Sequence, residues 1–298
     1  MKQVKRTFTP GSEWIYFKIY AGSKTLDNIL LQDISYIVNK LNKLSIIEKW
    51  FFIRYADPDS HIRVRFLINN SKHIGEVITL LHQRLEYLIK SNSVWKIQLD
   101  TYRRELERYG YNTIEETEQI FYKDSECILD ILKLIKKFQN ENYRWMIALT
   151  MIDSLLSDFS FNMESKFQLM ETMSCSFMLE FGFNKFNSKQ FNSKFRDKKN
   201  IIESVLNNEI KDENFHKLSE YVTKKTINLK STVKQLQIKL VNSKNSQLDS
   251  LLQSYIHMML NRLFISKNRV HELVLYDFMR RYYTSEISKN KYIAKTHA

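Results

Sequence analysis

The scarcity of glycine and proline is the feature that most restricts the fold of this chain. Five glycines and two prolines occur among 298 residues, too few for a turn-rich all-β protein or for a collagen-like or linker-like chain. The phosphate-binding motifs GxGxxG and GxxxxGK[ST] do not occur in the sequence. The sequence therefore favours helices with a limited number of strands, and it gives no support to a nucleotide-binding loop.

Composition and charge restrict the class of protein further. Hydrophobic residues make up 43% and aromatic residues 13% of the chain, which is typical of a folded domain. A net charge of +13 suggests an anionic partner, such as nucleic acid, an acidic peptide or an acidic substrate. An AT-rich genome, which enriches Lys and Asn, explains the same charge without a partner.

The sequence also predicts the compartment of the protein. Its first residues lack the apolar segment of a signal peptide, and no apolar run of about 18 residues could span a membrane. Cys127 and Cys175 are far apart and lack the CxxC spacing of a zinc or redox site. We therefore expect a cytoplasmic protein with reduced thiols and no membrane span.

Strand and helix patterns alternate over the first hundred residues. Aromatic and β-branched runs predict strands, and apolar residues repeating at three and four predict amphipathic helices. The succession β-α-β-β-α-β is that of a ferredoxin-like unit. The predicted strands are 14–20, 49–55, 61–68 and 94–100, and the predicted helices are 26–44 and 71–91.

Helical periodicity dominates after Gly110. The sequence predicts a loop in the Asn- and Ser-rich stretch 181–195 and a frayed polar end over the last ten residues. The fold is therefore predicted as α+β, with a ferredoxin-like unit (1–110) packed on a larger, mainly helical half (111–298). The predicted helices of that half are 114–138, 142–159, 162–182, 198–209, 212–240, 246–265 and 267–287.

The third predicted strand carries an unusual pattern. His61, Arg63 and Arg65 share one face of the strand, and the apolar residues between them share the other. A tight turn at 57–60 would set Arg54 opposite Arg63. Arginine pairs bind carboxylate or phosphate well, although a solvated face with arginines packed on aromatic rings is the plain alternative. We expect the helical half to cover this face and form a basic cleft.

Two further groups could carry chemistry. Glu105 and Arg108 are three residues apart and would lie side by side on a helix. A surface ion pair that contributes little is the alternative to a functional role. His257 and Asn261 are four residues apart on a predicted helix, where the imidazole suits proton transfer and a buried structural histidine is the alternative. The motifs of zinc proteases and serine hydrolases do not occur in the sequence.

A series of sequence blocks resembles one known family. The chain resembles the C-terminal elimination domain of lantibiotic dehydratases, which also exists as free-standing thiopeptide-type bacteriocin biosynthesis proteins. The pattern RYxDPxxHxRxRF is the most specific, and the resemblance covers residues from about 10 to 270. The blocks, in order, are PGSEWIYFKIY, WFFIRYADPDSHIRVRF, TYRRELERYG with IFYKDS, and SYIHMMLNR.

The resemblance implies an activity and a set of site residues. In that family, Ser and Thr of a precursor peptide are esterified with glutamate from glutamyl-tRNA, and the elimination domain removes the glutamate to leave dehydroalanine or dehydrobutyrine. The activity is that of a lyase without cofactor or metal. The implied catalytic residues are His257, Arg63, Arg65, Arg108 and Glu105, and the implied substrate-binding residues are Arg54, His61 and Asn261.

The resemblance also implies partners. Because the sequence begins just before the PGSEW block, we expect the glutamylating half to be a separate protein, with tRNA nearby through that partner. The other partner is the glutamylated precursor peptide. The sequence leaves open whether the chain forms a homodimer. Tyr111 follows Gly110 where the family commonly has a second glycine, so the local loop could differ.

Two other functions compete with elimination. Thiopeptide pyridine synthases resemble this chain too, and they join two dehydroalanines by a formal [4+2] cycloaddition with loss of the leader peptide. A non-catalytic protein that recruits peptide or tRNA to a partner enzyme is the second alternative. The joint presence of the arginines, Glu105 and His257 favours elimination.

Overall fold

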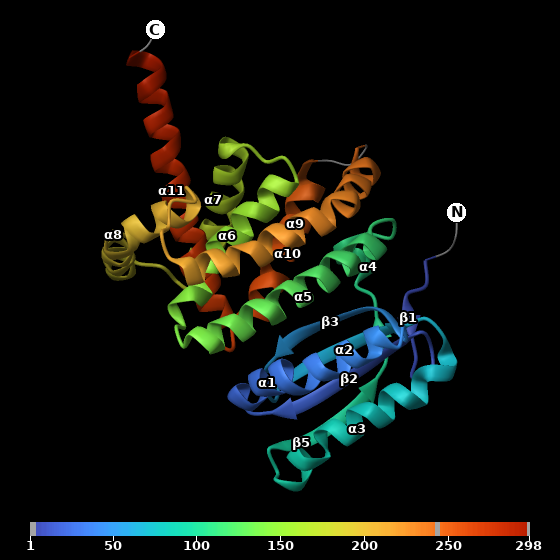
Figure 1. Cartoon of the computed structure of the whole chain (residues 1–298). Coiled ribbons are helices and arrows are strands. Elements are labelled where there is room, and N and C mark those ends of the chain that lie inside the picture. The colour runs from blue at the N-terminus through green and yellow to red at the C-terminus, as the bar shows by residue number, and fades with distance from the viewer. Residues whose placement is uncertain (1–3, 242–244, 297–298) are drawn as a thin grey trace. The chain divides into compact units, whose positions relative to one another are not determined.

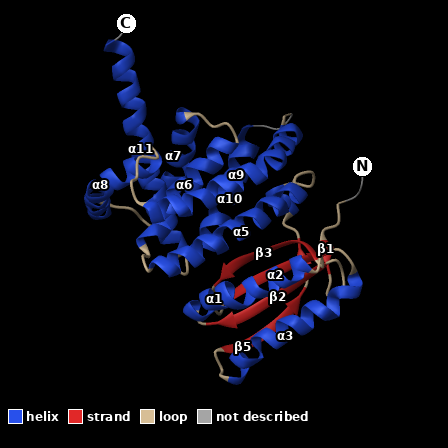
Figure 2. Cartoon of the chain, in the orientation of Figure 1, coloured by secondary structure: helices blue, strands red, loops and turns tan. Residues whose placement is uncertain are grey.

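The structure, a computed structural model, describes residues 4–241 and 245–296. The fold is α+β, as predicted: the described strands all lie in the first part of the chain, and long helices follow (Figures 1 and 2). The strands are β1 (Thr7–Phe8), β2 (Trp14–Ala21), β3 (Ile47–Tyr55), β4 (His61–Ile68), β5 (Val94–Asp100) and β6 (Tyr102–Arg103). The early helices are α1 (Ser23–Ile29), the π-helical turn η1 (Leu30–Ile34), α2 (Ser35–Lys43), the 3-10 turn η2 (Ser71–His73), α3 (Ile74–Lys90) and α4 (Leu106–Tyr109). The later helices are α5 (Ile114–Phe138), α6 (Asn142–Asp158), α7 (Met163–Glu180), α8 (Lys185–Leu206), α9 (Glu213–Leu240), α10 (Asn245–Leu263) and α11 (Asn268–Thr296).

The chain divides into two compact units, and each is described by itself. Unit 1 consists of residues 1–133, 234–242 and 261–266, and unit 2 consists of 134–233, 243–260 and 267–298. Helices α5, α9 and α10 each contribute residues to both units. These units are defined by their internal packing and not by independent folding. The predicted domain boundary at residue 110 therefore stays a prediction.

A four-stranded antiparallel sheet in the order β3-β4-β2-β5 organises unit 1. The predicted succession of strands and helices is confirmed, with strand ends within about two residues of the expected ones. Alternation gives the sheet two unlike faces. One face, here called the helix face, presents fully buried residues such as Phe52, Val64 and Phe66 to α1, α2 and α3. A short second sheet pairs β1 with β6.

The register of the β3–β4 hairpin differs from the expected one. Tyr55 pairs with His61, so residues 56–60 form the connection, one residue more than the predicted turn at 57–60. A shift of one residue moves a side chain to the other face of a sheet. Arg54 therefore stands opposite Ile62 on the helix face, and the prediction that it stands opposite Arg63 is wrong.

Side chains close the outer edge of β3. The amide of Phe52 donates to Ser125 Oγ (3.2 Å), and its carbonyl accepts from Arg262 Nε (2.8 Å). Asn261 bonds Arg54 at both ends, accepting from its amide and donating to its carbonyl, each at 2.9 Å. These contacts satisfy the outward backbone groups of Phe52 and Arg54, which on an open edge strand would attract a further strand.

Unit 2 consists of helices, and it contains two departures from the sequence prediction. The stretch 181–195, predicted as a loop, lies largely in α8, because α8 begins at Lys185. Of the last ten residues, which were expected to be frayed, 289–296 belong to α11, whereas 297 and 298 lie outside the described residues. The helices pack around buried side chains such as Ile152, Leu252 and Tyr276. Among the helices in the described residues, none combines the length and hydropathy that a membrane crossing requires.

Candidate functional site

Two arginines, Arg63 and Arg65, share one face of β4, a strand that is paired on both sides. Side chains two positions apart in a strand share a face and lie about 7 Å apart. Lys18 of β2 and Ile53 of β3 stand opposite Arg63. The predicted sharing of a face is confirmed, and this surface, the arginine face, lies opposite the helix face.

Aromatic rings surround the guanidinium group of Arg65. Its Cζ atom lies 4.2 Å from the ring centre of Tyr16, 4.8 Å from that of Tyr102 and 5.2 Å from that of Phe51. The side chain is almost fully buried, with 8% of the residue exposed. In the described part of the chain, Nε of Arg65 has no hydrogen-bond partner and no carboxylate forms an ion pair with the group. Burial lowers the pKa of Arg65, and the charge of Arg63 acts in the same direction.

His61 positions Arg63 through a hydrogen bond to its guanidinium group. Its Nδ1 donates to the carbonyl of Asp59 (2.8 Å), so its Nε2 is free to accept from Arg63 Nε (3.1 Å). The imidazole ring stacks on Tyr20, and the Arg63 guanidinium lies 3.6 Å over the ring of Tyr55. Burial lowers the pKa of His61, and the nearby cations add to that effect. His61 is thus a buried, neutral support for Arg63.

The remaining charges leave the arginine face positive. Lys18 pairs with Asp100 of β5, whereas Arg63, like Arg65, has no carboxylate partner among residues 4–241 and 245–296. The first part of α5 contacts this face, where the rings of Phe121 and Phe51 lie 5.6 Å apart. The wider cleft with the rest of the helical half stays a prediction. Two cations held among aromatic rings form a surface that suits a carboxylate or phosphate.

Glu105 and Arg108 lie at the short helix α4, also in unit 1. Arg108 Nη1 is 3.6 Å from Glu105 Oε2, and both side chains are exposed, so their ion pair is weak. Buried Tyr109 contacts Arg108, whose guanidinium lies 5.3 Å from its ring centre, and Phe121 of α5, whose ring centre is also 5.3 Å away. Burial is the main cause that raises the pKa of Tyr109 to about 12, so this hydroxyl stays a hydrogen-bond donor.

Arg54 and Asn261, both expected to bind substrate, are occupied in the structure of unit 1. Arg54 Nε donates to the carbonyl of Arg262 (3.0 Å), and its Nη2 pairs with Asp27 of α1. Asn261 bonds the backbone of Arg54, as described above. Both residues join the β3 edge to its neighbours, and the structure does not bring them to the arginine face.

His257 lies in α10, within unit 2, and forms a pair with a buried acid. Its Nδ1 is 3.0 Å from both carboxylate oxygens of Glu272 on α11. Glu272 is fully buried and also accepts from the hydroxyl of Tyr276 (3.1 Å), while Arg269 lies 3.7 Å away. The His257 side chain remains 29% exposed. A carboxylate at Nδ1 holds the proton of the neutral ring there and leaves Nε2 as the nitrogen with a lone pair.

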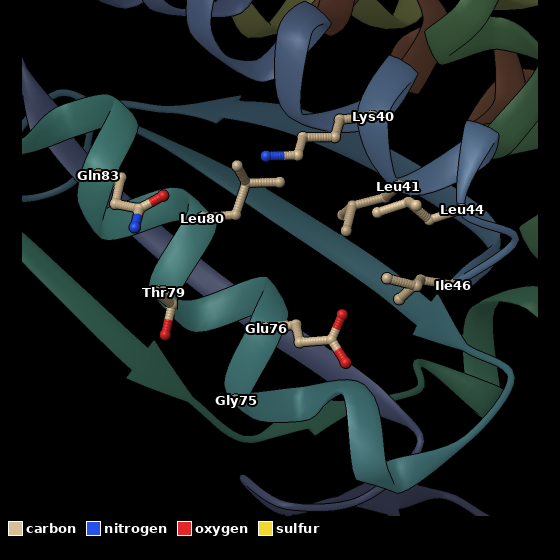
Figure 3. Close-up of a pocket in the computed structure, with 9 residues that line it drawn as sticks. All are labelled: Lys40, Leu41, Leu44, Ile46, Gly75, Glu76, Thr79, Leu80 and Gln83. Carbon is tan, nitrogen blue, oxygen red and sulfur yellow. The ribbon is translucent and has the colours of Figure 1, made fainter.

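Two concave regions of unit 1 lie outside the arginine pair. A cavity of about 760 Å³ at the Trp14 and Leu67 end of the arginine face contains three cations, but each has an acidic partner: Lys5 with Glu13, Arg104 with Glu118 and Lys239 with Glu116. A smaller pocket of about 360 Å³ lies between α2 and α3. Figure 3 shows its lining, with Leu80 and Glu76 of α3 directed toward α2. Neither contains a predicted site residue.

Several residues of these sites were missed by the sequence prediction. The aromatic cage of Arg65 includes Tyr102 of β6, which follows the fourth predicted strand and gave no strand signal. Glu272 could have been found as one of two acids, with Asp277, in the largely apolar helix stretch HELVLYDFM. No group of three or more His, Cys, Asp or Glu side chains in the described residues is placed to hold a metal ion.

The sequence as a whole matches a known family. The family model for the C-terminal region of lantibiotic biosynthesis dehydratases matches residues 14–283. The chain belongs to this family. The predicted resemblance is therefore confirmed, and the motif residues of β4, α4 and α10 lie within the matched region.

Two curated members of the lantibiotic dehydratase group are similar to the chain. It is 26% identical over 277 residues to the subtilin biosynthesis protein SpaB of Bacillus subtilis, covering 89% of this chain and 25% of SpaB. It is 26% identical over 293 residues to the nisin biosynthesis protein NisB of Lactococcus lactis subsp. lactis, covering 96% of this chain and 27% of NisB. The chain thus spans about a quarter of these relatives.

Solved structures share the fold of the chain. The tRNA-dependent lantibiotic dehydratase MibB from Microbispora sp. 107891 matches 95% of this chain and 29% of its own, with a TM-score of 0.72 and 17% identity. TsrL matches 93% of this chain and 95% of its own, with a TM-score of 0.72 and 13% identity. The pyridine synthase TbtD from thiomuracin biosynthesis matches 93% and 99%, with a TM-score of 0.66 and 9% identity.

Proposed function

We propose that this protein removes glutamate from glutamylated Ser or Thr residues of a ribosomally made precursor peptide and leaves dehydroalanine or dehydrobutyrine. The observation that carries the proposal is the arginine face: Arg63 and Arg65 lack carboxylate partners in the described part of a chain of this family. The strand order β3-β4-β2-β5 supports a ferredoxin-like frame for this face.

The arginine pair suits the leaving group of this reaction. A glutamyl ester carries a free carboxylate, and a second carboxylate forms when the ester bond to the peptide residue breaks. Arg63 and Arg65 bind these groups, and the aromatic cage keeps water from competing for the Arg65 guanidinium. Because the two cations are already fixed in place, charge that develops as glutamate departs meets positioned donors.

His257 takes the proton in this proposal. Its Nε2 accepts the Cα proton of the esterified residue, the Cα–H electrons form the Cα=Cβ bond, and the Cβ–O bond breaks to release glutamate. Glu272 holds Nδ1, which fixes the tautomer and stabilises the imidazolium that forms. A fully buried carboxylate with a tyrosine donor is suited to that supporting role.

Arg108 and Glu105 complete the proposed catalytic set. Their exposed ion pair lies beside Tyr109, whose ring contacts Arg108 and also Phe121, a neighbour of the arginine face. The weak pair can open when a substrate carboxylate arrives, since an exposed ion pair contributes little free energy. In this proposal Arg108 adds a third cation for the substrate, and His61 acts by supporting Arg63.

The proposed partners follow from the chemistry. The substrate is a precursor peptide that already carries glutamate, and a separate glutamylating protein that uses glutamyl-tRNA supplies it. Unmodified precursor incubated with this protein alone should therefore stay unmodified. Dehydration of the precursor in that mixture would contradict the division of the two steps.

One experiment tests the activity directly. The purified protein is incubated with a synthetic peptide that bears a glutamyl-serine ester, and mass spectrometry follows the loss of glutamate. The wild type should release glutamate, His257→Ala should release it about 10²–10⁴-fold more slowly, and Arg63→Ala should accumulate the ester. Arg103→Ala, an exposed arginine of β6, is the control and should match the wild type.

A second function has a specific observation in its favour. The pyridine synthase TbtD matches this chain over 99% of its own length, and such an enzyme would join two dehydroalanines instead of making them. If the protein releases no glutamate but forms a ring from a bis-dehydroalanine peptide, its function is pyridine synthesis and not elimination. Failure of both reactions would favour a non-catalytic recruiting role.

A further inference from the structure

The two edges of the unit 1 sheet differ. Side chains of α5 and α10 bond the outer backbone groups of β3, as described above. At the other end of the order β3-β4-β2-β5, strand β5 pairs with β2 alone. Throughout the described residues, no backbone or side-chain group bonds the outer edge of β5. A seven-residue strand with an open edge is a template for a further strand.

The register identifies which groups of β5 face outward. Outward groups alternate with inward ones along a strand, and on β3 the outward residues are Phe52 and Arg54. Carried through the pairings of β3 with β4, β4 with β2 and β2 with β5, this alternation makes Ile97 and Leu99 the outward residues of β5. Their amides and carbonyls are the groups that a new strand would use.

The side chains at this edge are of two kinds. Leu99 lies on the helix-face side, opposite Phe17, and is 37% exposed, and Trp95, the unpaired residue at the register shift between Val94 and Lys96, is 53% exposed. Both values are high for large apolar residues of a strand. Lys96, Gln98 and Asp100 lie on the arginine-face side, since they stand opposite Tyr20, Lys18 and Tyr16. An added strand would cover the apolar side and needs charges that complement Lys96 and Asp100.

We propose that β5 pairs antiparallel with β5 of a second copy of this chain. Centred on Gln98, the pairing sets Ile97 opposite Leu99 of the partner subunit, which is the register that joins the outward backbone groups. The same register sets Lys96 opposite Asp100 of the partner subunit, twice by symmetry, and each Asp100, which also pairs with Lys18 of its own chain, then lies between two cations. Opposite charges in directly facing positions stabilise a sheet, so the edge is complementary to itself in backbone, apolar side chains and charge.

The pairing has a consequence for the arginine face. An isologous antiparallel contact places the two-fold axis perpendicular to the sheet. The two four-stranded sheets then form one continuous sheet, and the arginine faces of both copies lie on the same side. This inference does not depend on the proposed reaction, because it rests on the edge of β5 alone.

Charge exchange at the two facing positions tests the pairing. Sedimentation velocity over a concentration series should show a monomer–dimer equilibrium for the wild type. Lys96→Glu and Asp100→Lys should each raise the dimer dissociation constant about tenfold, since both symmetric pairs change from attraction to repulsion. An equal mixture of the two variants should restore the dimer, because a heterodimer then has two opposite-charge pairs. Lys43→Glu, an exposed lysine of α2, is the matched control.

A backbone variant separates strand pairing from other contacts. Leu99→Pro removes an outward amide that the monomer does not use, so the fold should survive by circular dichroism while the dimer is lost. A wild type that stays monomeric at every concentration overturns the proposal, as does a dimer that withstands Lys96→Glu and Leu99→Pro. If the monomer instead binds the precursor peptide and Leu99→Pro abolishes that binding, the β5 edge is a peptide-binding site and the proposed dimer is wrong.

Discussion

Arginines on the face and at the edge of one sheet have different surroundings. At the β3 edge, Arg54 and Arg262 bond backbone carbonyls and lie near Asp27 and Asp124. On the arginine face, aromatic rings contact the guanidinium of Arg65, and no described carboxylate pairs with it. The same residue type thus bonds backbone carbonyls and neighbours carboxylates in one place, and is surrounded by aromatic rings without a carboxylate among the described residues in the other. The comparison predicts that substitutions at the two places separate activity from stability.

The largest expected effect concerns the face. Arg65→Met keeps the length of the side chain and removes the charge, so glutamate release should fall about 10²–10³-fold, as for loss of one positioned donor. The melting temperature should stay the same or rise, because the buried cation has no carboxylate to lose. Product formation and thermal unfolding are measured on the same preparation. A marked fall in melting temperature would make Arg65 a structural residue.

The next effect concerns the edge. Arg262 is fully buried, and burial lowers its pKa to about 10. Arg262→Met should lower the free energy of unfolding by about 3 kcal/mol, because it leaves the buried Asp124 beside an apolar side chain. Urea unfolding measures the loss. Activity per folded molecule should change little. A loss of activity without a loss of stability would show that Arg262 takes part in the reaction.

A smaller effect is expected one residue earlier. Asn261→Ala removes both bonds to the Arg54 backbone and should cost about 1–2 kcal/mol of unfolding free energy, since water can reach part of that edge. Equilibrium unfolding, with Asn42→Ala at an exposed position of α2 as control, provides the measurement. If Asn261→Ala leaves stability intact and slows elimination, Asn261 binds substrate as the sequence predicted.

The smallest expected effect is on the pH dependence of the free energy of unfolding, and it concerns His61. Its pKa is lowered from 6.5 in the folded protein, so the unfolded chain takes up the proton first as the pH falls. The contribution of His61 is therefore complete above pH 6.5 and declines below it. Urea unfolding at about pH 7.5 and about pH 5.5 should show a smaller loss for His61→Gln than for the wild type. An equal loss in both proteins would show that His61 is not the group responsible.

Sequence patterns located the arginine face but not the edge. Alternation along 61–68 is a local property, so it placed Arg63 and Arg65 on one face correctly. The face on which Arg54 lies depended on the length of the hairpin connection. That connection, 56–60, is one residue longer than expected, which places Arg54 on the opposite face of the sheet. The role of Asn261 depends on a contact with Arg54 that no local pattern reveals.

The helical part shows the same limit. Asn and Ser favour turns, so the stretch 181–195 was predicted as a loop, yet α8 includes most of it and its Phe195 packs on Phe278 of α11. Contacts with another helix can override weak local propensity. Glu272 was passed over because an acid in a helix is ordinary until its partner, His257, is known.

The closed edge of β3 also has a consequence for the newly made chain. Arg54 and Asn261 are separated by 207 residues, so at ribosomal speed roughly 10–40 s pass between their syntheses. Until α10 is made, the carbonyl of Phe52 and the backbone groups of Arg54 lack their partners. This part of the strand is then exposed to the neighbouring chains of a polysome, where strand exchange starts aggregates. Slower translation between these two points would therefore lower the yield of native protein without any change in its sequence.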